Sequence, residues 1–188
     1  MTFSLGIAEN YAMTVFPAIL RRIRQQLSGM HARVVVDYDE RVAKGWQSGH
    51  LDIAIGATRF FSAPPEKSWL SQLHWVCAPD CMPDPHQPLA LIVYGETCFM
   101  REMIRQAVTA AGFEYKIVVT SSNMGVITAA IESGMGIALI GPDIFRQSTM
   151  KKVGLPLPDL TLSYGMYVAP HRNKALGRVL EILDSFFY

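Results

Sequence analysis

The stretch FSLGIAENYAMTVFPAILRRIRQQ, residues 3–26, decides the fold class because its hydrophobic period changes part-way. Its first six residues are largely apolar, which predicts a buried strand over 3–8. After Glu9-Asn10-Tyr11 the apolar residues recur at helical spacing, and Pro17 falls near the first turn, where a missing N–H costs little. The stretch therefore predicts a strand followed by a helix over residues 13–27, whose apolar residues are Val15, Phe16, Ile19, Leu20, Ile23 and Leu27.

The same alternation of strand and helix continues along the chain. Strands are predicted over 32–38 and 51–56, with a short helix between them that runs to Ser48 and that Asp39 can cap. This β-α-β-α-β order is typical of a parallel sheet covered by helices. After the proline-rich residues 57–88, in which 73–78 can be a strand, the order repeats. The second set comprises strands 89–94, 115–120 and 136–141 and helices 98–111 and 123–133, and a strand over 160–170 and an amphipathic helix complete the chain.

Two α/β lobes follow from this repeated order. Lobe I is predicted to comprise residues 1–77 and 165–188, and lobe II residues 78–164. Two extended crossovers, near 73–79 and 161–168, are expected to join them. Ligands of open α/β sheets bind outside the carboxyl ends of the strands, so a site is expected where the two lobes face each other.

Composition excludes several classes of protein. The chain has 188 residues, of which 50% are hydrophobic and 18% are charged, so it is not disordered. Its 17 basic residues against 16 acidic ones give a net charge of +1. Duplex binding depends largely on neutralising phosphates, so this chain alone is not expected to hold DNA.

A cytoplasmic location is expected, without a membrane. No apolar run approaches the roughly 20 residues that span a bilayer, and the first residues lack the pattern of a secretory signal. The cysteines are three in number, at 77, 81 and 98, which fits a reducing compartment better than a disulfide framework. Export with the signal already removed is the alternative.

Catalysis is not expected from the motifs. The five histidines are scattered, and the sequence contains no zinc-binding H-E-x-x-H, no nucleophile elbow G-x-S-x-G, no phosphate-binding Walker A and no dinucleotide-binding G-x-G-x-x-G. No metal and no cofactor is implied.

Three segments together resemble the effector-binding domain of LysR-type bacterial transcription regulators. They are SLGIAENYAMTVFPAILRRIRQQ (4–26), GHLDIAIG (49–56) and VITAAIESGMGIALIG (126–141), and their order and spacing carry the resemblance over essentially the whole chain. The resemblance implies a type 2 periplasmic-binding-protein-like fold, in which two Rossmann-like lobes are joined by two hinge strands.

The resemblance also implies a function. A small-molecule effector binds in the cleft between the lobes, and its presence is transmitted to an N-terminal winged helix-turn-helix that is absent from this chain, so DNA is contacted only through that missing domain. One alternative is a solute receptor of a transporter. Another is a redox sensor, since one branch of the family senses peroxide through cysteines.

Six residues of lobe I are candidate effector ligands by this resemblance. The loop after the first strand supplies Ala8, Glu9, Asn10 and Tyr11, and Ala57 and Thr58 follow the strand over 51–56. N–H groups at the start of a helix can also receive a ligand acceptor. The structural alternative is that Asn10 or Thr14 caps the helix. Glu9, Asn10 and Ala57 depart from the family pattern, which indicates an uncharged or weakly acidic effector.

Five residues of lobe II form the facing half. Thr97, Cys98 and Phe99 follow the strand over 89–94, and Ser122 and Asn123 follow the strand over 115–120. The alternatives are that Thr97, Ser122 or Asn123 caps a helix and that Phe99 belongs to the core. Cys98 at a helix start can be a reactive thiolate or a small buried hydrophobe.

A homodimer or a higher homo-oligomer is also implied. Family members pair the first helix of one lobe with a helix of the other lobe in the partner, which here are residues 13–27 and roughly 122–133. Ile23 and Ile131 are candidate contacts on these helices, although either can instead be core.

Overall fold

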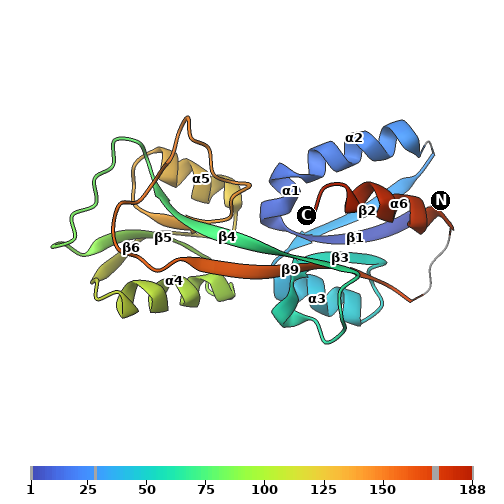
Figure 1. The fold of residues 1–188 in the computed structure, drawn as a ribbon, viewed down its shortest axis with the longest axis horizontal. Helices are drawn as coiled ribbons and strands as arrows, with labels where there is room; N and C mark the ends of the chain where they lie inside the picture. The colour runs from blue at the N-terminus through green and yellow to red at the C-terminus, as the bar shows by residue number, and fades with distance from the viewer. Residues whose placement is uncertain (1, 28, 171–173, 188) are drawn as a thin grey trace. The chain divides into compact units, whose positions relative to one another are not determined.

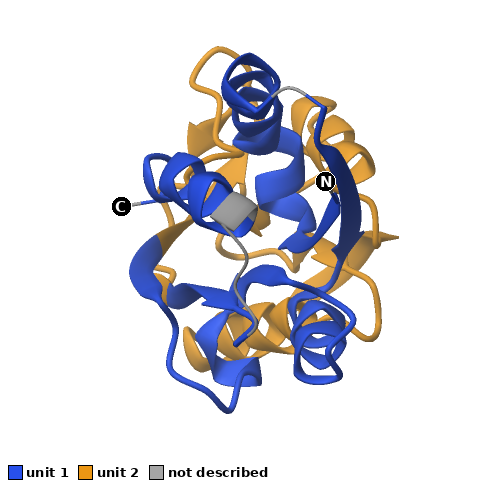
Figure 2. Ribbon diagram, turned by 90° about the vertical axis from the view of Figure 1, so that its right-hand side faces the viewer, with its two compact units in different colours: residues 1–71, 162–188 blue, residues 72–161 orange. Residues whose placement is uncertain are grey.

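The chain folds into two compact α/β units in a computed structural model, which describes residues 2–27, 29–170 and 174–187 (Figure 1). Unit 1 comprises residues 1–71 and 162–188, and unit 2 comprises residues 72–161 (Figure 2). The chain passes from one unit to the other within strand β4 (Lys67–Cys77) and early in strand β9 (Leu160–Val168). The lobe boundaries predicted from the sequence lie slightly farther along the chain and stay a prediction.

The sheet of unit 1 has β1 (Thr2–Ala8) between two parallel neighbours. β2 (His31–Asp37) pairs with it through Ala8 opposite Asp37, and β3 (Ile53–Ala57) through Ile7 opposite Ile55. The carboxyl ends of all three strands therefore meet at one edge. β9 then joins β3 in the antiparallel direction.

Helices cover both faces of this sheet. They are α1 (Glu9–Thr14), α2 (Phe16–Gln26), α3 (Asp39–Gln47) and α6 (Lys174–Asp184), and a short 3₁₀ turn, η1 (Thr58–Phe60), follows β3. Figure 1 shows α2 and α6 on one side of the sheet and α3 on the other. Leu5, Ile7, Ile53 and Ile55 are fully buried, as expected of central strands with both faces covered.

Unit 2 is built around a parallel pair, β5 (Leu89–Tyr94) and β6 (Tyr115–Ser121), in which Tyr94 lies opposite Ser121. Helices α4 (Phe99–Ala110) and α5 (Met124–Glu132) follow the two strands. β7 (Ala138–Ile140) and β8 (Lys151–Lys152) both pair with β4 in the antiparallel direction. The core includes Leu91, Ile92, Ile104 and Ile127, all essentially without exposure.

One prediction about local structure is wrong, and one strand is longer than predicted. The single helix over 13–27 is two helices that meet at Val15, because Pro17 has no N–H to donate to the carbonyl of Met13. β4 begins at Lys67, well before the predicted residue 73. Its first half alternates exposed and half-buried positions, and this mixed pattern hides a strand from a search for apolar runs.

The candidate dimer contacts Ile23 and Ile131 are core residues. Their exposed fractions are 6% and 0%, so neither side chain is available to a second copy of the chain. The exposed large apolar residues of α2 and α5 are Leu20 and Val126.

Among the described residues, no helix combines the length and the hydropathy needed to cross a bilayer.

Gly112 is expected to be a sensitive position, because it ends α4 with φ +82°, a conformation that residues with a side chain rarely adopt. Gly112→Ala should lower the free energy of unfolding by about 1 kcal/mol. Gly154→Ala is the matched control, since Gly154 has no positive φ and open space at its Cβ position. Urea denaturation of both variants is the measurement, and equal midpoints for the two would contradict the assignment.

Candidate functional site

The carboxyl edge of unit 1 brings together the candidate residues predicted for lobe I. Ala8 ends β1 opposite Asp37 of β2, and Ala57 ends the neighbouring β3. Glu9, Asn10 and Tyr11 form the first turn of α1, directly after Ala8, and Thr58 begins η1 after Ala57. Parallel pairing thus places both predicted segments at one edge of one sheet.

Asn10 does not cap α1. The N-cap position is Ala8, and no side-chain cap bond is made there. The Asn10 carbonyl accepts a hydrogen bond from Thr14 Oγ1 at 2.8 Å, whereas its side-chain amide has no hydrogen-bond partner among the described residues. The prediction that Asn10 or Thr14 caps this helix is therefore wrong.

Tyr11 is packed into the interior of unit 1. Its side chain is 3% exposed, and its hydroxyl accepts a hydrogen bond from Trp69 Nε1 at 2.9 Å. The ring centroids of Tyr164 and Phe187 lie 5.0 Å and 5.4 Å from its own, both edge-on. This aromatic cluster anchors the turn that carries Glu9 and Asn10. Tyr11 therefore has a structural role at this edge.

Asp39, the first residue of α3, links that helix to the end of β3 by a hydrogen bond. Sequence reasoning missed this role. Its carboxylate accepts a hydrogen bond from the Ala57 N–H at 2.7 Å, while Tyr38 occupies the N-cap position without a side-chain cap bond. The Asp39 side chain is buried, and this burial raises the pKa of the carboxyl to about 6, although the bond from Ala57 lowers it. Sequence alone reads such an aspartate as a helix cap.

Thr58 is held within unit 1 in a similar way. Its hydroxyl donates to the carbonyl of Ser163 at 3.2 Å. Ala57 and Thr58 are therefore both tied to neighbouring parts of unit 1, the first through its N–H and the second through its hydroxyl.

The carboxyl edge of unit 2 brings together the remaining candidates. Because Tyr94 lies opposite Ser121, the residues that follow β5 and those that follow β6 meet at one edge. Thr97 is exposed, and its hydroxyl has no partner among the described residues. Cys98 takes the N-cap position of α4 and is 7% exposed, so the alternative in which Thr97 caps the helix is wrong. Phe99 is the half-buried first residue of the helix.

Asn123 is used as a helix cap, which was the alternative stated for it. Its side-chain oxygen accepts from the Val126 N–H at 3.1 Å, and its own N–H donates to Ser121 Oγ. Ser122 is exposed beside it, and its hydroxyl has no partner within the part of the chain that the structure describes.

Arg101 adds a positive charge to this edge of unit 2, which the sequence reasoning also missed. Its guanidinium donates to the carbonyl of Tyr94 at 3.3 Å and to the Thr120 hydroxyl at 3.4 Å, at the ends of β5 and β6. The edge of unit 1 carries the carboxyls of Glu9, Asp37 and Asp39, and Arg41 Nη1 lies 3.6 Å from Asp37 Oδ1. Arg59, directly after Thr58, adds a second positive charge, so both edges hold charges of both signs.

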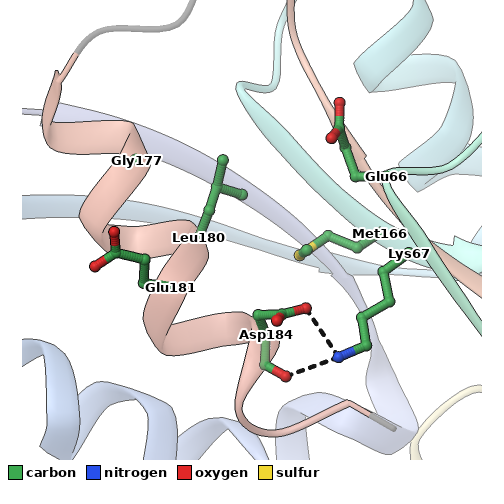
Figure 3. A pocket seen from close by; sticks show the side chains of 7 residues that line it. All are labelled: Glu66, Lys67, Met166, Gly177, Leu180, Glu181 and Asp184. Atoms are coloured by element: carbon green, nitrogen blue, oxygen red, sulfur yellow. Dashed lines mark hydrogen bonds and ion pairs between the residues drawn. The ribbon is translucent and has the colours of Figure 1, made fainter.

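Two hollows lie away from these edges. One, of about 310 Å³, is in unit 1 between β4, β9 and α6, and Lys67 Nζ is 2.8 Å from Asp184 Oδ1 at its border (Figure 3). The other, of about 200 Å³, is in unit 2 and is lined in part by Cys81, Lys116 and Met135. Neither is lined by a residue predicted to bind the effector.

Comparison with known proteins identifies the family. The LysR substrate binding domain matches residues 1–185. The chain belongs to this family. A curated relative, the HTH-type transcriptional regulator PecT of Dickeya dadantii (strain 3937), is 24% identical over 188 residues. The match covers 98% of this chain but only 59% of PecT.

Solved structures of the same family share the fold of this LysR domain. The regulatory domain of HypT from Salmonella typhimurium has a TM-score of 0.81 at 14% identity, covering 98% of this chain and 94% of that one. The CcmR regulatory domain from Synechocystis PCC6803, in complex with 2-PG, has a TM-score of 0.71 at 15% identity, covering 98% and 95%. The predicted two-lobe, type 2 periplasmic-binding-protein-like α/β fold is confirmed.

Ionisation of Asp39 is expected to make the stability of the LysR domain depend on pH. A folded-state pKa of about 6, against an ordinary value of 3.8, means that the folded state binds the proton more tightly than the unfolded state. Raising the pH from below 4 to above 6 should therefore cost about 3 kcal/mol of unfolding free energy at most. Asp39→Asn keeps an acceptor for Ala57 and should remove this loss.

Urea denaturation at a series of pH values measures the effect. The matched control is Glu114→Gln, which removes an exposed carboxylate from unit 2 and should keep the wild-type profile. Parallel profiles for wild type and Asp39→Asn would show that the Asp39 carboxyl does not titrate in this range.

Proposed function

We propose that this chain is the effector-sensing domain of a LysR-type transcriptional regulator. The match of the LysR substrate binding domain to residues 1–185 is the observation that carries the proposal. Because the chain spans 59% of the length of PecT, DNA contact is assigned to a DNA-binding domain of the full-length protein. Neither catalysis nor a cofactor belongs to the proposed function, and the proposed location is the cytoplasm.

The residues proposed to bind the effector lie, within each unit, at the carboxyl edge of that unit's own strands. Asn10 supplies an amide from unit 1, and Thr97 and Ser122 supply hydroxyls from unit 2; these polar side chains have no partner among the described residues. Glu9 and Phe99, which are half-buried, are proposed to complete the surface. Ala8, Ala57 and Cys98, which are predicted ligands but are at most 7% exposed, are proposed to hold it in place together with Tyr11, Thr58 and Asn123. An effector changes the state of a regulator only if it binds one arrangement of the domain better than another.

The departures from the family pattern at Glu9 and Ala57 support an uncharged or weakly acidic effector. The Glu9 carboxyl disfavours a ligand with several negative charges, since like charges repel at short range. The Arg101 guanidinium in unit 2 can pair with a single acidic group.

Thermal-shift screening of a metabolite library on the purified domain tests this proposal. A ligand that raises the melting temperature should lose a clear part of that effect with Thr97→Val or Asn10→Ala, because each change deletes a hydrogen-bonding group worth about 1 kcal/mol of binding free energy. Matched controls are Thr109→Val and Gln26→Ala, which make the same kind of change at exposed helical positions. Stabilisation that survives both site variants would place the ligand elsewhere.

A homodimer or a higher homo-oligomer is part of the proposal. Leu20 of α2 is 41% exposed and Val126 of α5 is 48% exposed, so each offers an apolar contact on the helices that the family pairs. Leu20→Glu and Val126→Glu should weaken self-association at least tenfold, because each brings a charge into an apolar contact.

Sedimentation equilibrium measures this association. Met82→Glu makes the same change at a residue that is 87% exposed and lies on neither helix, so it should leave association unchanged. Unchanged association of all three variants would contradict the proposed use of α2 and α5.

A further inference from the structure

Two cysteines of unit 2 lie side by side around one tight turn. Cys77 is the last residue of β4 and has no exposure, and Cys81 follows a turn closed by a 3.1 Å hydrogen bond from the Cys81 N–H to the carbonyl of Ala78. The Cys77 thiol donates to the Cys81 carbonyl oxygen, which lies 3.8 Å from the Cys77 sulfur. Both are thiols in this structure.

The two thiols differ in access to small molecules. Cys81 is half-buried and lines the hollow of about 200 Å³ in unit 2, beside Lys116 and Met135. Cys77 has no exposure and does not line this hollow. A reagent that enters the hollow therefore contacts Cys81 and not Cys77.

The environment of Cys77 determines whether its thiol can act as a nucleophile in thiol–disulfide exchange. Burial, and after it the neighbouring Cys81 thiol, raise the pKa of Cys77 to about 11, so this residue carries its proton at neutral pH. A protonated thiol is a poor first nucleophile, because the thiolate is the reacting form. Once Cys81 has been modified, however, Cys77 lies close enough to attack the Cys81 sulfur within the molecule.

We propose that Cys77 and Cys81 form a reversible dithiol–disulfide pair that reacts with small-molecule disulfides. This site is separate from the effector surface and does not depend on the proposed function. The disulfide bridge fixes the turn that follows β4. This strand is one of the two in which the chain passes between the units.

The exchange is balanced without any further reactant. The Cys81 thiolate attacks a disulfide RSSR, the S–S bond breaks, and one RS⁻ leaves and takes up the proton that Cys81 lost. The Cys77 sulfur then attacks the Cys81 sulfur of the mixed disulfide and gives up its proton, and the second RS⁻ leaves as RSH. The pair loses two electrons and two protons, and RSSR is reduced to two RSH.

Oxidised glutathione is the probe, applied to the reduced, folded chain. Cleavage on the amino side of aspartates places Cys77 in fragment 52–79 and Cys81 in fragment 80–83, so only a bridge keeps these fragments together. The expected result is a linked pair of fragments in the mass spectrum and a fall in titratable thiols from three to one. Dithiothreitol should restore all three.

Matched variants separate the pair from the third cysteine. Cys98→Ser should still form the bridge and lose both remaining thiols. Cys77→Ser should stop at a stable mixed disulfide on Cys81, and Cys81→Ser should form no bridge. Because Cys81 is half-buried, Cys81→Ser keeps the test valid even if Cys77→Ser fails to fold. An unchanged thiol count in the wild type, a mixed disulfide that persists on Cys81 with Cys77 present, or a bridge to Cys98 would each overturn the proposal.

Discussion

The parallel pairing of β1 with both β2 and β3 is the constraint on which the candidate site of unit 1 depends. Strands that run in the same direction end at the same edge, so residues far apart in the chain, such as Ala8 and Ala57, arrive together. The β5–β6 pair does the same for Thr97 and Ser122 in unit 2. Each edge then exposes loops and helix starts that the sheet core holds rigidly, which is what a binding surface requires.

The loops at each edge are held by contacts with the interior of their own unit. These contacts do not engage every polar side chain of the loops. The Tyr11 aromatic cluster and the bond from Ala57 to the buried Asp39 carboxylate hold the loops of unit 1. The Asn123 cap and the Arg101 guanidinium hold those of unit 2. With the loops fixed in this way, the amide of Asn10 and the hydroxyl of Thr97 can bind a ligand without paying for local ordering.

Sequence reasoning found the strands and helices because their hydrophobic periods are strong, and it found both edges because parallel topology follows from the order of elements. It could not assign the tasks of individual side chains there. Asp39 and Tyr11 illustrate the reason. In the sequence one is interpreted as a helix cap and the other as an effector ligand, yet their partners, Ala57 and Trp69, are distant in the chain. The break at Val15 and the early start of β4 were missed because a local interruption or a mixed pattern weakens the period.

The most direct test of the account is NMR mapping of backbone amide shifts while a stabilising ligand from the thermal-shift screen is added. The account predicts that the largest changes fall on residues 8–11 and 57–58 in unit 1 and on residues 97–99 and 122–123 in unit 2. Changes confined to the hollow beside Lys67 and Asp184 (Figure 3), with both edges unaffected, would contradict it.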